Sequence, residues 1–302
     1  MSSVRFIVDK KLNLFCHFMI CTDIHRYLRN RYYKQENYAL FNEDEYEFFR
    51  EDLPIYCLEL LLKIVSDHPD LDTDCLKRSF DSYLFTFLDR KAKRYFAYWK
   101  ERESQLLALK QCLEKEWSAI EEKLQMAIEN VMREKSSLDD LRIFLVDAFY
   151  GRKEGEGISS TAEVNMVDNN LLLIFACEPE HACSLFRIIV HEIIHKPLSR
   201  IIGQLHDEMK LRTDETTIVS ETFARLIEKE VCTEIGIQPM TEEEIRKNTE
   251  RFGFLDFYLQ TSSVWQDYIE DTSRSSLKEF IKWDVEQNRE VLKKCEYSSS
   301  FL

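Results

Sequence analysis

The chain has 302 residues, of which 44% are hydrophobic and 12% aromatic, so it is long enough to bury one large core or two smaller ones. Its formal net charge of -14, spread along the whole chain, argues against a nucleic-acid surface and against binding to anionic membranes. It contains only six glycines and five prolines, which excludes the turn-rich architecture of most all-β proteins and favours long helices.

The cysteine content and the hydropathy of the chain indicate the cellular compartment of the protein. The nine cysteines are odd in number and include no C-x-x-C pair, which indicates free thiols in a reducing environment. Cys16, His17, Cys21 and His25 lie close together, but their spacing fits no common zinc template. No apolar run reaches the roughly 18 residues that would span a bilayer. We therefore expect a cytoplasmic protein that does not associate with membranes.

The N-terminal part of the chain is predicted to be mainly helical. Residues 4–9, VRFIVD, are apolar and β-branched and predict one short strand, whereas residues 11–100 show mostly helical periodicity. Residues 103–132 predict a long helix of roughly 45 Å. Its apolar side chains form a seam of the a/d type: Leu106, Leu113, Trp117, Ile120, Leu124, Ala127 and Val131. We expect this seam to pack within its own domain, with a helix of a partner protein as the alternative.

Strand signals gather after residue 139. Residues 141–151, LRIFLVDAFYG, and residues 170–177, NLLLIFAC, are apolar runs typical of buried strands. Between them lies a glycine-rich loop at 151–157, followed by ISSTAEV, residues 158–164, for which we expect an edge strand. Helices are predicted at about 214–234, 241–260 and 275–294.

These patterns predict an α+β fold that is predominantly helical. We expect a mainly helical region at 1–138 and a second region at 139–302. Within the second region, residues 139–200 would supply a small sheet and a helix, and residues 201–302 would be helical.

The stretch FRIIVHEIIHKPLSR, residues 186–200, contains the pattern H-E-x-x-H. On a helix, His191 and His195 lie one turn apart on the same side, so both can bind one metal ion. Glu192 is rotated by about 100° and can reach a water bound to the ion without binding the ion itself. Pro197 clashes with the carbonyl group of Ile193, so we expect the helix to kink or end there. The opposite face of this helix is apolar, formed by Ala182, Leu185, Phe186, Ile189, Val190 and Ile193.

A zinc site with an open position for water needs a third protein ligand. A third histidine ten residues after His191 is excluded, because Ile201 stands there. The helix predicted at 214–234 offers Glu221, followed by Ala224 in the pattern E-x-x-A, and we take Glu221 as the third ligand. The sequence leaves other candidates open: Glu228, His206, Glu208, Asp214 and Glu215.

His191, Glu192, His195 and Glu221 resemble the ligand and base set of gluzincin metallopeptidases, the thermolysin-like clan. The resemblance extends from about residue 140 to residue 232 and implies a zincin-like fold, with a small mixed sheet beside the helix that carries the motif. Two departures are the longer interval between His195 and Glu221 than in thermolysin and the absence of the N-E-x-x-S-D signature.

The resemblance implies a zinc-dependent peptidase with Zn²⁺ as cofactor and a peptide or protein as substrate. Glu192 would be the general base. A His or Tyr from the second half would donate to the oxyanion, and the candidates are His206, Tyr258 and Tyr268. The substrate would pair with the edge strand expected at residues 158–164. The alternative is a non-enzymatic helical protein-interaction module that uses residues 103–132, with a structural metal or none.

Overall fold

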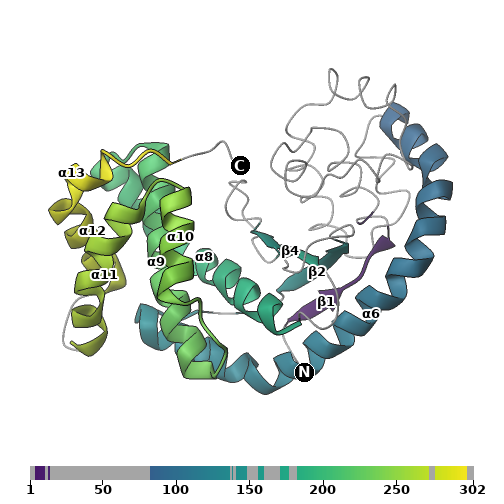
Figure 1. The fold of residues 1–302 in the computed structure, drawn as a ribbon, viewed down its shortest axis with the longest axis horizontal. Coiled ribbons are helices and arrows are strands. Elements are labelled where there is room, and N and C mark those ends of the chain that lie inside the picture. The colour runs from purple at the N-terminus through teal and green to yellow at the C-terminus, as the bar shows by residue number, and fades with distance from the viewer. Residues whose placement is uncertain are drawn as a thin grey trace. The chain divides into compact units, whose positions relative to one another are not determined.

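The computed structural model describes residues 4–10, 13, 82–136, 138, 141–147, 156–159, 171–176, 182–271 and 276–297. Most of these residues are helical, and four short strands form one sheet, so the predicted α+β class with a predominance of helix is confirmed (Figure 1). The four residues Cys16, His17, Cys21 and His25, and most of the helical region expected at 11–100, lie outside the described residues.

The chain divides into two compact units. The first comprises Met1–Glu116, Asp139–Leu185 and Phe301–Leu302, and the second comprises Trp117–Leu138 and Phe186–Ser300. Each unit therefore combines segments that are separated in the sequence, whereas the sequence predicts a single boundary after residue 138. The long helix α6 (Ser82–Met132) contributes to both units.

The sheet belongs to the first unit and has the strand order β1-β2-β4-β3. The strands are β1 (Arg5–Ile7), β2 (Arg142–Asp147), β3 (Glu156–Ser159) and β4 (Leu171–Ala176). β2 runs parallel to both β1 and β4, and β3 pairs antiparallel with β4, so the sheet is mixed. Every residue of β2 is buried, as expected for an apolar central strand.

The edge position of β3 agrees in part with the expected edge strand. β3 begins within the predicted glycine-rich loop and includes only Ile158 and Ser159 of the segment 158–164. The remainder of that segment lies outside the described residues.

A buried polar network ties the N-terminal segment to β2. The side chain of Asn13 donates to the carbonyl oxygen of Leu145 and accepts from the backbone N–H of Asp147 at 2.7 Å. Arg102 of α6 forms an ion pair of 2.8 Å with the carboxylate of Asp147, and both side chains are buried. Because each buried polar group has a partner, the network stabilises the end of β2 without leaving an unpaired charge.

Helix α6 is longer than predicted because no glycine or proline interrupts residues 82–132. The predicted seam is buried at six of its seven positions, and Ile120 is partly exposed. A partner helix that used this seam would have to displace the parts of the chain that already cover it.

The helices after the sheet follow the predicted pattern, except that the helices expected at 241–260 and 275–294 are each divided in two. They are α8 (Ala182–Met209), α9 (Thr213–Ile235), α10 (Glu242–Arg251), α11 (Leu255–Glu270), α12 (Leu277–Gln287) and α13 (Arg289–Leu292). The single helix expected at 241–260 is two helices, because Gly253 adopts a φ of +81° between α10 and α11. The side chains of Thr241 and Ser276 accept from the N–H groups of Glu244 and Glu279 and thereby cap α10 and α12.

The prediction that the motif helix ends near Pro197 is wrong, because α8 continues to Met209. A proline inside a helix removes one hydrogen bond and costs about 3 kcal/mol. After Pro197 the apolar periodicity continues, and each of these buried side chains contributes about 1.5–3 kcal/mol, which offsets that cost. The side chains concerned are Leu198, Ile201, Ile202 and Leu205.

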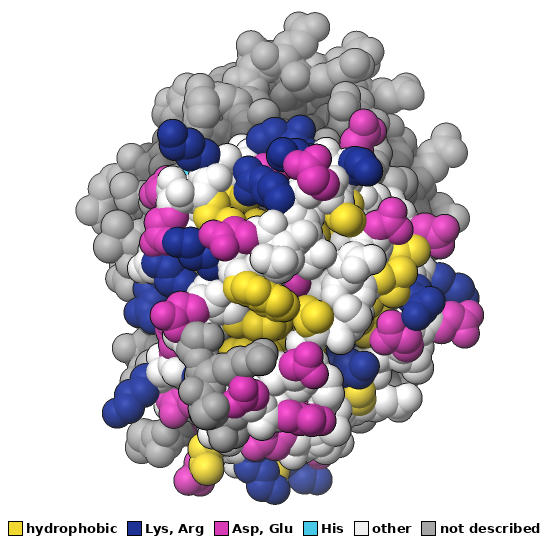
Figure 2. All heavy atoms as spheres, turned by 90° about the vertical axis from the view of Figure 1, so that its left-hand side faces the viewer, with side chains coloured by type: hydrophobic (Ala, Val, Ile, Leu, Met, Phe, Trp, Pro, Cys, Tyr) yellow, Lys and Arg dark blue, Asp and Glu magenta, His cyan; other side chains and the backbone are white. Residues whose placement is uncertain are grey.

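Charged side chains are dispersed over the surface, as the sequence predicts. On the face drawn in Figure 2, acidic and basic side chains alternate around small apolar patches. Among the described helices, none combines the length and the apolar character needed to cross a bilayer.

Candidate metal centre

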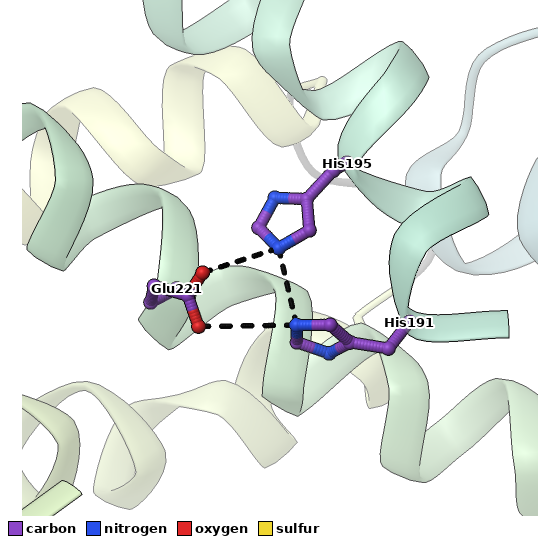
Figure 3. Close-up of side chains that lie close together, drawn as sticks. All are labelled: His191, His195 and Glu221. Atoms are coloured by element: carbon purple, nitrogen blue, oxygen red, sulfur yellow. Dashed lines mark hydrogen bonds and ion pairs between the residues drawn. The ribbon is translucent and has the colours of Figure 1, made fainter. Parts of the chain in front are cut away.

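Two helices bring three predicted ligands together. His191 and His195 project from α8, and Glu221 projects from α9 toward the same point (Figure 3). One ligand atom from each residue lies within 4.8 Å of the other two. The three side chains are largely buried, with exposed fractions of 13%, 11% and 22%. This arrangement is therefore no chance cluster of solvated surface groups.

The spacing of the donor atoms suits zinc. Ligand bonds of about 2.0–2.1 Å at a tetrahedral angle place two donor atoms roughly 3.4 Å apart. The two Nε2 atoms of His191 and His195 are 3.1 Å apart, and Nε2 of His195 is 3.4 Å from Oε1 of Glu221. Nε2 of His191 lies 3.8 Å from Oε2 of Glu221. The three donor atoms would have to move by only a few tenths of an ångström to bind a zinc ion.

A buried carboxylate lies behind His191. Oε2 of Glu228 is 2.8 Å from Nδ1 of His191, and Oε1 of Glu228 forms an ion pair of 3.2 Å with Arg187. Burial opposes ionisation of Glu228, but the hydrogen bond from His191 and the charge of Arg187 outweigh it and lower the pKa of this carboxyl. The ionised carboxylate only accepts, so Nδ1 of His191 donates. A neutral His191 ring then presents the lone pair of Nε2 to the cluster.

The other two ligands also have partners. Nδ1 of His195 lies 3.2 Å from the hydroxyl oxygen of Ser220, the residue that precedes Glu221 on α9. Oε2 of Glu221 forms an ion pair of 3.1 Å with Arg225, one helical turn further along. All three side chains are thus held in place by residues outside the cluster, as ligands of a metal site generally are.

Electrostatics keep Glu221 negatively charged. Burial opposes its ionisation, but the guanidinium of Arg225 and the neighbouring histidines outweigh burial and hold the pKa of Glu221 far below its ordinary value. Burial likewise disfavours the charged form of His195, yet its contact with Glu221 prevails and raises the pKa of His195. The cluster therefore attracts positive charge, either a proton or a cation.

Glu192 lies beside the ligands and has a different environment. Its side chain is partly buried. Burial raises the pKa of Glu192 above its ordinary value, although the nearby His191 and His195 favour its charged form. A carboxylate of raised pKa beside the ligands has the properties required of a general base.

Two of the three expected oxyanion donors, His206 and Tyr268, form hydrogen bonds with other residues, and the third, Tyr258, is near enough to Arg225 and Glu228 to feel their charges. His206 is eleven residues beyond His195 on α8, roughly 16 Å along the helix axis, and its Nδ1 lies 2.9 Å from the hydroxyl of Thr216. Tyr258 is buried in α11, and burial raises the pKa of its hydroxyl. Tyr268 donates its hydroxyl to the carbonyl oxygen of Val131 in the aromatic core.

The alternative third ligands also have other positions. Glu208 pairs with Lys278 near the end of α8, and Asp214 pairs with Arg212 at the start of α9. Glu215 accepts from the backbone N–H of Arg212. Of the candidates raised by the sequence, Glu221 alone joins both histidines in the described part of the chain, and Glu228 lies behind His191.

The sequence predicted no role for Arg187 and Arg225, and it offered Glu228 only as an alternative third ligand. Their spacing could have predicted that they lie beside the ligands. Arg187 precedes His191 by four residues, Arg225 follows Glu221 by four and Glu228 follows Glu221 by seven. Residues at these intervals share one helix face. Each of the two facing helices therefore presents a stripe of polar side chains to the other.

Comparison with known proteins does not extend this description. No family model matches the chain, and neither curated proteins nor solved structures include a significant match.

Proposed function

We propose that this protein is a zinc-dependent hydrolase, and in particular a metallopeptidase of zincin-like fold with Glu192 as its general base. The observation that carries the proposal is the convergence of two imidazole nitrogens and one carboxylate at zinc-like spacing. The choice of a peptide bond as the substrate rests on the resemblance of His191, Glu192, His195 and Glu221 to the gluzincin set.

The donor chemistry supports zinc over harder ions. Two imidazole nitrogens and one carboxylate oxygen form a ligand set typical of catalytic zinc, whereas magnesium and calcium prefer oxygen alone. His191, His195 and Glu221 would hold the ion and leave a fourth position open for water.

The charges near the cluster support binding of a cation. When ionised, the carboxylates of Glu192, Glu221 and Glu228 face the guanidinium groups of Arg187 and Arg225, which leaves one net negative charge. A cation bound there would offset that charge, as buried charges generally require.

Each residue has a distinct role in the proposed reaction. Zinc bound there would lower the pKa of a water to about 7 and polarise a carbonyl group. Glu192 would take a proton from that water as the water oxygen attacks the peptide carbonyl carbon, and would give the proton to the leaving amine as the C–N bond breaks. His191, His195 and Glu221 bind the ion and exchange no proton with the substrate.

The first experiment measures zinc per chain. Wild type purified without added metal is expected to contain about one zinc, His191→Ala to contain none, and Glu192→Gln to retain it, because Glu192 is no ligand. Atomic absorption reports the stoichiometry, and circular dichroism checks that each variant is folded. Failure of wild type to bind zinc even in excess would contradict the proposal.

The second experiment separates an enzyme from a metal-binding module without activity. Digestion of a denatured protein mixture, followed by mass spectrometry of the new termini, should show cleavage by the zinc-loaded wild type. Glu192→Gln, which retains zinc, should lower the cleavage rate at least about a hundredfold, the usual contribution of a general base. Equal activity in the two proteins would reject Glu192 as the base. Zinc binding without cleavage would favour the non-enzymatic module.

A further inference from the structure

Two residues of opposite charge contact the ligands. Glu228 contacts Nδ1 of His191, the ring nitrogen remote from the cluster, and Arg225 contacts Oε2 of Glu221, the oxygen that also faces His191. Both contacts are shielded from water, because the side chains of Glu228 and Arg225 are 3% and 11% exposed. Electrostatic effects at such positions are much stronger than on the surface.

Glu228 should strengthen binding of a cation at Nε2 of His191. Its carboxylate accepts the Nδ1 proton, which directs the lone pair of Nε2 toward the cluster and increases the electron density of the ring. The ion pair with Arg187 keeps Glu228 in place.

Arg225 should weaken binding at Glu221. Its guanidinium lies 3.1 Å from Oε2 of Glu221, so it neutralises part of the negative charge that a cation needs and competes for one of the two carboxylate oxygens. A positive charge also repels an incoming dication directly. Among the described residues, none accepts a hydrogen bond from the buried Nε of Arg225. Hydrogen bonding of all its donors therefore does not explain where this guanidinium lies.

We propose that Glu228 and Arg225 are positioning residues that set the metal affinity of this site in opposite directions: Glu228, through His191, strengthens metal binding, and Arg225, through Glu221, weakens it. This inference rests on the proposed metal site. It assigns both residues a role that the motif H-E-x-x-H does not contain.

The test compares two neutral substitutions. Glu228→Gln keeps an acceptor for His191 but removes the charge, and zinc affinity should fall about 10- to 100-fold. Arg225→Gln keeps a donor for Glu221 but removes the positive charge, and affinity should rise roughly tenfold, because a dication responds to that charge twice as strongly as a competing proton does. Competition with a chromophoric chelator at pH 8 and constant ionic strength measures both dissociation constants.

Matched controls on the same helix separate a local effect from a change in net charge. Glu230→Gln and Lys229→Gln make the same charge changes as the two test variants, at a partly exposed and an exposed position of α9. Both should bind zinc within about twofold of wild type, because solvent screens them. The inference is overturned if both test variants weaken binding, if neither changes it, or if the controls change it equally.

A measurement on the metal-free protein tests the contact of Glu228 without any bound ion. At pH 8, long-range ¹H–¹⁵N correlation spectra should show the His191 ring with its proton on Nδ1 in wild type, and a mixture of tautomers in Glu228→Gln. The proposed metal site itself fails if wild type and His191→Ala bind zinc equally or not at all, and the inference then fails with it. If wild type binds zinc through His191 but Glu228→Gln and Arg225→Gln do not change the zinc affinity in opposite directions, the inference alone is wrong.

Discussion

At the scale of single residues, Asp284 couples the stability of the helical unit to pH. Its side chain is fully buried in α12, where its oxygens accept from the hydroxyl of Thr261 and the amide of Asn288. Burial raises the pKa of Asp284 to about 6, and these two hydrogen bonds only partly oppose it. The stability that the neutral carboxyl contributes is therefore complete below about pH 4 and is lost as the pH rises through about 6.

We therefore expect Asp284→Asn to stabilise the protein at pH 8 relative to pH 4. The difference in unfolding free energy between variant and wild type should increase by about 2–3 kcal/mol across this range, since one pKa unit corresponds to about 1.4 kcal/mol. Urea denaturation at several pH values measures it. Asp267→Asn, at an exposed position of α11, is the matched control and should show no such trend. Parallel pH profiles of wild type and Asp284→Asn would contradict the prediction.

At the scale of elements, two glycines have opposite roles. Gly203 lies inside α8, and a Cβ there would meet nothing within 4 Å. Gly253 separates α10 from α11 with a φ of +81°, and a Cβ there would lie 2.2 Å from the backbone oxygen of Glu296. The first glycine is replaceable, while the second allows the chain to turn against the C-terminal segment.

Alanine at these two positions should therefore change stability in opposite directions. Gly203→Ala should stabilise the protein by about 0.5–1 kcal/mol, because alanine loses less backbone entropy in a helix. Gly253→Ala should destabilise it by more than about 1 kcal/mol, since it combines a left-handed conformation with a clash against backbone. Chemical denaturation measures both effects, and a neutral Gly253→Ala would show that the turn relaxes easily.

At the scale of the whole molecule, the proposed ion would join α8 to α9 and so couple zinc binding to folding. At a free zinc concentration a hundred times the dissociation constant, binding adds about 2.7 kcal/mol to the unfolding free energy. The melting temperature of wild type should then rise by roughly 4 °C, because the unfolding entropy is about 2 cal/mol/K per residue over 302 residues. A chelator should reverse the rise, and His195→Ala should show none. An equal shift in wild type and His195→Ala would mean that zinc stabilises the protein elsewhere.

The sequence by itself determined the local elements and most of the ligand set. Apolar runs indicated β2 and β4, uninterrupted helical periodicity indicated α6 and α9, and the four-residue interval placed His191 and His195 on one side of a helix. These features depend on residues close in the chain, where period and propensity govern conformation. Glu221 was proposed from the same kind of pattern, and the structure places it with both histidines.

Tertiary structure alone decided the rest, because it depends on contacts between distant segments. Burial of the residues after Pro197 carries α8 through a proline that local rules treat as a stop. The pairing of α8 with α9 turns Glu228 from a candidate ligand into the partner of His191 and places Arg225 against Glu221, while His206 faces Thr216 instead. A residue's spacing predicts which face of a helix it occupies, but only the packing of two helices determines what that face meets.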